Sequence, residues 1–263
     1  MESARDRRGV RHSRDEIRDV MMDAGRSLLI EEGLGIGAGD LTFKRVFDRV
    51  EATHGVRLTN ASVIRRVWEN QAEFQDDVLA AVARAGDTAG DTGAAAGAVL
   101  PLVGSFDLST PEGRLRGMSQ MARVGGEAAL RAMVGSKHWS LWVGVWVLGV
   151  TGPPSERGRQ IRRALFDGYE TTTEAWELLH GAMVGALGLR VREPFRLRQF
   201  TVAVGAMVEG CALRDGAARE GEPIMRPTGP DGAMEEWTLV GVGLEALVHQ
   251  FLEIDPDWSV PTA

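Results

Sequence analysis

The sequence has a single cysteine, Cys211, among 263 residues. One cysteine excludes an internal disulfide and is typical of a reducing cytoplasm. Long apolar runs are also missing: the longest, residues 139–150, is interrupted by Ser140 and two glycines, whereas a membrane span needs roughly 20 apolar residues. The arginine-bearing N-terminus has no apolar run behind it, so no signal peptide is expected. These absences predict a soluble, cytoplasmic protein with no membrane partner.

Sequence patterns that carry catalysis or bind metal ions are missing as well. The five histidines form no metal-ligand pattern, and the Glu177–His180 pair lacks the second such motif that a di-iron bundle needs. No Gly-x-Ser-x-Gly turn or phosphate-binding loop is present, and the glycines at 35, 37 and 39 follow no strand. Cys211 is expected to be a small buried hydrophobe rather than a nucleophile. We therefore predict that the protein is not an enzyme and has no catalytic residues, cofactor or metal site.

Charge is distributed unevenly along the chain, whose net charge is −7. Residues 1–66 hold 13 Lys and Arg against 11 Asp and Glu, and the remaining residues hold 17 against 26. A basic head on an acidic body suits a polyanion-binding module on a carrier that repels the polyanion. Chance clustering of charge is the alternative interpretation.

The apolar periodicity predicts an all-α protein, because no alternating run bounded by turn residues occurs. Residues 1–84 are expected to form an arm and a helix-turn-helix module, and residues 85–263 a helical effector-binding and dimerisation domain. The simple segment 86–98 is either a weak helix or a hinge. Later helices are expected from Thr110-Pro111, over 138–150, from Ser155 to about Gly188, from Pro194 to about Arg214, and from Glu235 to about Ile254.

Four helices are expected in the N-terminal module. A capping box of Ser13 and Glu16 begins the first, and Gly33 ends it. The later helices begin at Asp40 or Thr42, at Thr59 or Asn60, and at Asn70, and His54-Gly55 breaks the second of the four. In the third helix the residues expected to face inward are Ala61, Ile64, Val67 and Trp68.

The third helix is expected to carry an exposed polar face. Thr59, Ser62 and Arg66 are spaced i, i+3 and i+7, so they would share one side of a helix. Arginine can fork onto guanine, and Ser or Thr can bond bases or phosphates. Lys44, Arg45 and Arg49 on the preceding helix could hold the DNA backbone. This is the layout of a helix-turn-helix; a merely solvated polar face is the alternative.

These residues resemble a motif of the TetR family of bacterial repressors over roughly residues 13–84. Gly55-Val56 matches the turn of that motif, Ile64 and Trp68 match its Leu and Phe, and Asn70 and Phe74 match the beginning of its fourth helix. The chain departs from the motif where Arg65 replaces Tyr, Val67 replaces His and Gln71 replaces Lys. The resemblance implies a homodimeric repressor that binds a near-palindromic double-stranded DNA operator. Residues expected at the DNA are Thr42, Lys44, Arg45, Arg57, Thr59, Asn60, Ser62, Arg65, Arg66 and Gln71.

The larger domain is rich in tryptophan and methionine, which indicates either a packed core or an apolar effector pocket between helices. Few charges interrupt residues 139–151, so a hydrophobic small molecule is the expected effector. Residues expected to line its site are Met118, Met121, Trp139, Trp142, Trp146, Tyr169 and Trp176.

Two segments near the C-terminus are expected to pair between subunits, as in TetR-like proteins. Ala203, Ala206 and Gly210 form a small-residue face, and Gly241, Leu244 and Val248 form a second stripe. The alternative is that both complete the core of a monomer. The rival function is a helical small-molecule-binding or interaction protein whose degenerate helix-turn-helix does not bind DNA.

Overall fold

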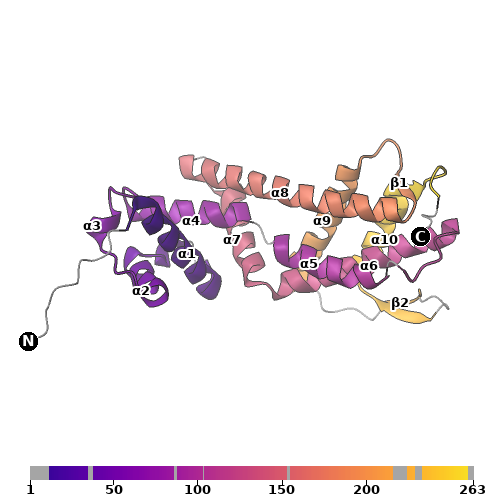
Figure 1. Ribbon diagram of the computed structural model, residues 1–263, viewed down its shortest axis with the longest axis horizontal. Coiled ribbons are helices and arrows are strands. Elements are labelled where there is room, and N and C mark those ends of the chain that lie inside the picture. Colours follow the sequence, from indigo (N-terminus) through magenta and orange to yellow (C-terminus); the bar gives the residue numbers. More distant parts are fainter. Residues whose placement is uncertain are drawn as a thin grey trace, which may run out of the picture. The chain divides into compact units, whose positions relative to one another are not determined.

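Figure 1 shows the computed structural model of the protein, which describes residues 12–34, 38–85, 88–102, 104–152, 155–215, 224–228 and 233–259. The described residues are mostly helical and the strands are short, so the all-α class is confirmed. The elements are α1 (Arg14–Glu32), η1 (Ala38–Asp40), α2 (Phe43–His54), α3 (Asn60–Val63), α4 (Gln71–Ala85), α5 (Thr88–Val99), η2 (Leu100–Leu102), α6 (Pro111–Gly135), α7 (Lys137–Thr151), α8 (Glu156–Ala186), β1 (Leu189–Val191), α9 (Leu197–Asp215), β2 (Ile224–Pro227), β3 (Met234–Trp237), α10 (Leu239–Phe251) and β4 (Leu252–Ile254).

The chain divides into two compact units that differ from the two domains expected from the sequence. The N-terminal unit combines the described parts of Met1–Ala85 with Ser140–Phe166, and the C-terminal unit combines those of Gly86–Trp139 with Asp167–Ala263. The first boundary lies next to the expected one at residue 84. The segment 140–166, expected in the larger domain, belongs instead to the unit that holds the helix-turn-helix candidate.

The expected ends of the first two helices are confirmed. Ser13 Oγ accepts a hydrogen bond from the backbone N–H of Glu16, and the Glu16 carboxylate accepts one from Ser13 N, so the capping box is formed. Gly33 follows α1 with φ 81°. Thr42, rather than Asp40, caps α2, and Gly55 ends it in the left-handed region with φ 66°, where a residue without Cβ is favoured.

Three aromatic rings form the centre of the N-terminal unit. Trp68 meets Phe74 edge to face with ring centroids 4.9 Å apart, and Phe43 lies 5.5 Å from Phe74. Gly25 lets α1 approach α4 closely, because a Cβ there would lie 3.0 Å from the Phe74 ring and from Val78. This packing fixes α1, α2 and α4 around the loop that contains Trp68.

The third helix is much shorter than the sequence suggested. α3 ends at Val63, Ile64 is extended, and Arg65 has φ 63°. Of the positions expected to face inward, Val67 and Trp68 are buried, whereas Ala61 is exposed and Ile64 only half-buried; Val63 is buried instead. Trp68 is 1% exposed, and its carbonyl accepts from Arg65 N at 2.7 Å. Burying the indole therefore replaces the next helical turn by a tight loop.

The segment 140–166 packs as a helical corner within the N-terminal unit. A Cβ on Gly149 of α7 would lie 2.6 Å from Leu165 and 3.1 Å from Ile161 of α8. Arg162 donates to the Gly149 carbonyl at 3.0 Å. Arg157 Nε lies 2.6 Å from Asp76 Oδ1 and ties the beginning of α8 to α4.

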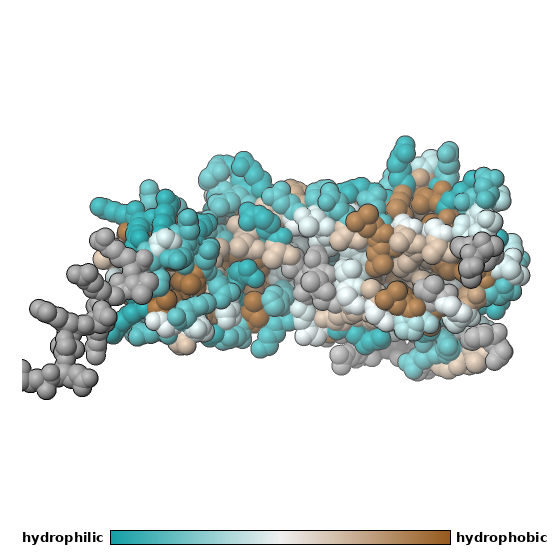
Figure 2. Space-filling view, in the orientation of Figure 1, coloured by the Kyte–Doolittle hydropathy of each residue, from teal (hydrophilic) through white to brown (hydrophobic). Residues whose placement is uncertain are grey.

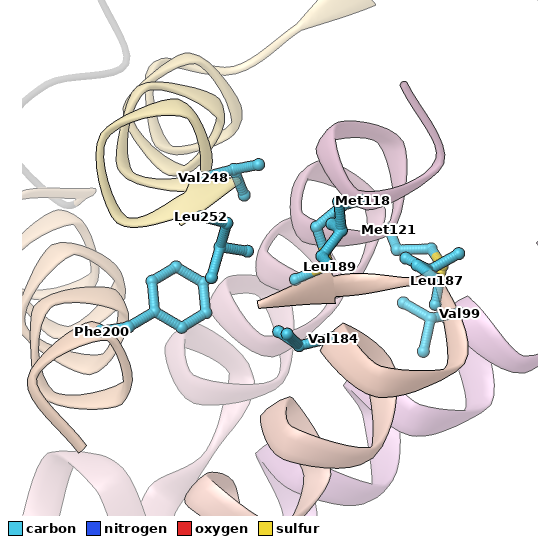
Figure 3. Packing of buried hydrophobic residues seen from close by; sticks show 9 residues of the cluster. All are labelled: Val99, Met118, Met121, Val184, Leu187, Leu189, Phe200, Val248 and Leu252. Atoms are coloured by element: carbon cyan, nitrogen blue, oxygen red, sulfur yellow. The ribbon is translucent and has the colours of Figure 1, made fainter. Parts of the chain in front are cut away.

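The core of the C-terminal unit is a cluster of apolar side chains from helices and short strands. In Figure 3 its labelled side chains point toward one another. Its members are Val99, Met118, Met121, Val184, Leu187, Leu189, Phe200, Val248 and Leu252. α6 lies close to α10, since a Cβ on Gly126 would be 2.0 Å from Leu244.

One of the two stripes expected to pair between subunits is therefore part of this core. Leu244 and Val248 are 1% and 0% exposed, and a Cβ on Gly241 would lie 2.9 Å from Arg123 of α6. Gly241, Leu244 and Val248 complete the protomer's own packing. The prediction that they face a second subunit is wrong.

Two short strand pairs were not expected from the sequence. β1 pairs antiparallel with β4, and β2 with β3, with Arg226 opposite Glu235. Glu235, expected to begin the last helix, lies in β3, and α10 begins only after its cap, Thr238. The Trp237 ring of β3 contacts the guanidinium groups of Arg226 and Arg123, whose carbons lie 4.4 and 5.2 Å from its centroid. Within the described residues, no helix is both long and apolar enough to cross a membrane.

Candidate nucleic-acid interface

A cleft of about 620 Å³ opens in the N-terminal unit between α2 and the segment that leads into α3. It is lined by Thr42, Phe43, Lys44, Phe47, Asp48, Glu51, Arg57, Leu58, Thr59, Asn60 and Gln71. Six of these were expected at DNA from the sequence, namely Thr42, Lys44, Arg57, Thr59, Asn60 and Gln71. Residues that are far apart along the chain are thus brought to one surface.

The lining of the cleft combines an apolar base with charges of both signs. Phe43 and Leu58 are buried, whereas Lys44 and Arg57 are exposed together with Asp48 and Glu51. Arg57 Nε lies 3.8 Å from Glu51 Oε1. The visible face of the N-terminal unit is mostly hydrophilic (Figure 2). The cleft can therefore bind polar and charged groups, but its own charges balance.

The beginnings of two helices open onto the cleft. Thr42 caps α2 through a bond from Arg45 N to its hydroxyl at 3.4 Å, and Gln71 is the first residue of α4. Gln71 Oε1 accepts from Phe43 N at 3.0 Å, which joins the two helix beginnings. Each beginning carries a partial positive charge from its free N–H groups. Their convergence makes this end of the cleft favourable for an anionic group.

Four of the ten expected DNA residues do not line the cleft. The Ser62 hydroxyl accepts from Thr59 N and donates to Thr59 O, so it holds the short α3 together. Arg45 is paired with Glu32 and also donates to the Asp40 carbonyl at 3.0 Å. Arg65 and Arg66 lie beyond α3 and are exposed. These four residues are Arg45, Ser62, Arg65 and Arg66.

The exposed helix face expected from Thr59, Ser62 and Arg66 is not formed, because α3 ends before Arg66. Arg66 Nη2 donates to the His12 carbonyl at 2.8 Å. The turn that carries Arg65 and Arg66 is fixed by Trp68, whose indole N–H donates to Asp77 at 2.9 Å. Arg18 donates to the same carboxylate oxygen at 2.8 Å. The two arginines are presented by this fixed turn rather than by a helix.

Arg45 and Arg49, the arginines of α2 expected to hold the DNA backbone, form surface ion pairs with side chains of the same protein. Arg49 donates to Glu31 at 2.7 Å and to Ser27 at 3.0 Å, and Arg45 pairs with Glu32. All three partners, Ser27, Glu31 and Glu32, belong to α1. Lys44 is exposed, and of the three side chains it alone lies in the cleft.

The residues expected to line an effector pocket are distributed over both units. Met118 and Met121 are buried in the C-terminal core cluster. Trp139 is buried in the same unit, whereas Trp142 and Trp146 belong to the N-terminal unit. Tyr169 donates to Glu209 at 3.2 Å, and burial raises the pKa of its phenol. Trp176 lies against the His180 ring with centroids 5.5 Å apart.

No model of a known protein family matches the chain, and no curated protein matches it. Any functional assignment therefore rests on the residues themselves.

His180 is a buried polar residue. In the sequence it was considered only together with Glu177, as one of the two motifs that a di-iron site needs. Its Nδ1 lies 3.0 Å from Thr201 Oγ1, and its ring also meets Phe200. Burial lowers the pKa of His180 to about 4, so the ring is neutral near pH 7. Among the described residues no cluster of three or more His, Cys, Asp or Glu could hold a metal ion.

Proposed function

We propose that the N-terminal unit binds double-stranded DNA and that the protein is a transcriptional regulator, acting as a repressor in the cytoplasm. The observation that carries this proposal is the cleft, where the beginnings of α2 and α4 converge beside Lys44 and Arg57. Helix N-termini and exposed cations together attract phosphate groups. The same cleft exposes Thr59 and Asn60, whose side chains can bond phosphates or base edges.

The Arg65–Arg66 pair adds support to the proposal. A residue with Cβ at φ 63° costs about 1–2 kcal/mol relative to ordinary backbone, and such residues cluster at functional sites. Both side chains are exposed. Guanidinium groups bind phosphate in a forked geometry, so these two arginines suit the DNA backbone.

The C-terminal unit would supply the regulation. We propose that it binds a hydrophobic small molecule and joins two subunits, so that the dimer recognises a near-palindromic operator. Trp139, Tyr169 and Trp176 remain candidate effector contacts in this unit. A ligand releases DNA only if it prefers the conformer that does not bind DNA.

A second candidate function is favoured by the charges around α2. Arg45 and Arg49 are paired with carboxylates of α1, and Asp48 and Glu51 offset the two cations of the cleft. A helical interaction or small-molecule-binding protein that does not bind DNA would have this charge balance. Binding to DNA separates the two functions directly.

The test is retention and sequencing of genomic DNA fragments by the purified full-length protein. A regulator retains a defined set of fragments. Arg57→Gln should then weaken binding to all DNA and reduce the slope of log affinity against log salt by about 1. Arg26→Gln, which removes an exposed arginine of α1 outside the cleft, serves as the charge-matched control. Failure of the wild type to retain any DNA at low salt would leave only the second candidate function.

A further inference from the structure

The helix that presents a continuous face to the cleft is α2, not α3. Lys44, Phe47, Asp48 and Glu51 are spaced i, i+3, i+4 and i+7, and all four line the cleft. They therefore form one continuous face of a helix of 12 residues. α3 has only four residues, and it contributes Asn60 alone to the lining.

We propose that α2 is the helix that reads DNA bases in this protein, with Lys44 and Asp48 as the residues that determine specificity. This inference rests on the proposed DNA binding. The opposite face of α2 carries Val46 and Val50, which are both fully buried, so the core holds the helix in place. Lys44 and Asp48 are both exposed.

The chemistry of this face matches the edge of a G·C-containing sequence. An ammonium group donates to guanine O6 and N7, and a carboxylate accepts from the cytosine N4 amino group. Four helical residues rise about 6 Å, which corresponds to about two base-pair steps at 3.4 Å each. Lys44 is thus expected to select guanine, and Asp48 cytosine, at positions about two base pairs apart.

The remaining charged residues of the cleft fit this orientation. Glu51 is held beside Arg57, 3.8 Å from its Nε, so its charge is partly neutralised. Arg57 lies in the segment facing α2, where it can meet a phosphate of the strand being read. Asp48 forms no ion pair among the described residues. An unpaired carboxylate beside phosphates is repelled unless it meets a donor, and base amino groups are the donors that DNA offers.

Because of this repulsion, removing the Asp48 charge should have opposite effects on specific and on non-specific DNA binding. Purified full-length wild type and Asp48→Asn are each used to select DNA from a library of randomised duplexes, and affinities are measured for the wild-type consensus and for a scrambled duplex. If Asp48 reads cytosine, Asp48→Asn binds the consensus at least about tenfold more weakly and its selected DNA loses the cytosine preference at one position. Its affinity for the scrambled duplex stays equal or rises.

Lys44→Gln should relax a guanine preference about two base pairs away from that position. Asp19→Asn, an equal change of charge on the exposed surface of α1, should leave the selected sequence unchanged. Asp48→Asn binding every duplex more tightly with an unchanged consensus would overturn the inference, as would a consensus altered by Asn60→Ala but not by Asp48→Asn. In either case the proposed DNA binding stands. A wild type that selects no sequence and retains no DNA refutes both.

Discussion

His180 shows how a single buried side chain makes stability depend on pH. Burial lowers its pKa to about 4 from the ordinary value of 6.5, so the folded protein favours the neutral ring. The resulting stabilisation is complete above pH 6.5 and is lost as the pH falls from 6.5 toward 4. A shift of this size corresponds to about 3 kcal/mol.

We therefore expect the free energy of unfolding of the wild type to fall more steeply between pH 6.5 and 4 than that of His180→Asn. Urea unfolding at half-unit pH intervals measures both curves. His138→Asn is the control, because His138 is exposed at the beginning of α7. Parallel curves for the wild type and His180→Asn would show that the ring reaches water when it is protonated.

Arg65 is a residue whose conformation no sequence pattern predicted. The helical spacing of apolar residues predicts that the third helix continues to Trp68, and the motif match at Ile64 and Trp68 supports the same prediction. The chain leaves the helix because Trp68 is buried against Phe74 and bonds Asp77, which lies in the next helix. A contact of this kind depends on tertiary packing and is invisible to spacing along one segment.

At the scale of elements, the helix beginnings were largely predictable and the strands were not. Ser13, Thr42 and Thr110 each cap a helix as expected, because capping depends on residues within one turn. β1 and β4 have three residues each and lie far apart in the chain. Strands of this length show no alternation, and nothing local specifies their partner.

The candidate site was also only partly predictable from the sequence. Six of the eleven residues that line the cleft were expected at DNA, from their polar character and their positions in the helix-turn-helix pattern. Asp48 and Glu51 were missed, because carboxylates count against DNA binding when charge alone is considered. Arg45 lies outside the cleft and pairs with Glu32 of α1, a contact between helices that spacing along one segment does not reveal.

Gln71 is expected to stabilise the junction of α2 and α4. Its Oε1 accepts from Phe43 N, one of the N–H groups at the beginning of α2 that has no partner within the helix. Gln71→Ala removes this acceptor and should lower the free energy of unfolding by about 1 kcal/mol. Gln71→Glu keeps an acceptor and adds an anion next to two helix beginnings, so it should retain the stability of the wild type or exceed it.

Chemical denaturation of the three proteins measures this ranking, and DNA binding measured in parallel separates packing from recognition. Because Gln71 lines the cleft, Gln71→Glu should weaken DNA binding while Gln71→Ala affects it less. Equal stability of Gln71→Ala and the wild type would mean that the Phe43 N–H is satisfied by water.

At the scale of the molecule, the small-residue face predicted to pair two subunits lies on α9 and is partly exposed. Val202 and Leu213 are 53% and 55% exposed, and Ala206 is exposed between them. Together with Gly210 they follow the spacing i, i+4, i+8 and i+11, which is one side of a helix. The other stripe suggested by the sequence is buried in the protomer, so α9 carries the expectation of a dimer alone.

Gly210→Trp tests that expectation without disturbing the protomer. A Cβ at Gly210 meets no atom within 4 Å, so a side chain can begin there without a clash at Cβ, and we expect the bulk of the indole to obstruct a second subunit. We expect light scattering at micromolar concentration to give a dimer for the wild type and a monomer for Gly210→Trp. The thermal unfolding midpoint of Gly210→Trp should fall only by the amount that the loss of the dimer explains, because binding of a second subunit stabilises the folded state. The affinity for a near-palindromic operator should fall when the dimer dissociates, because each subunit then binds its half-site singly.

Gly205→Trp is the matched control: its Cβ also meets nothing within 4 Å, and it lies about 140° around α9 from Gly210. A wild type that is monomeric at this concentration contradicts the prediction, and dissociation by Gly205→Trp alone would place the pairing surface on the other side of α9.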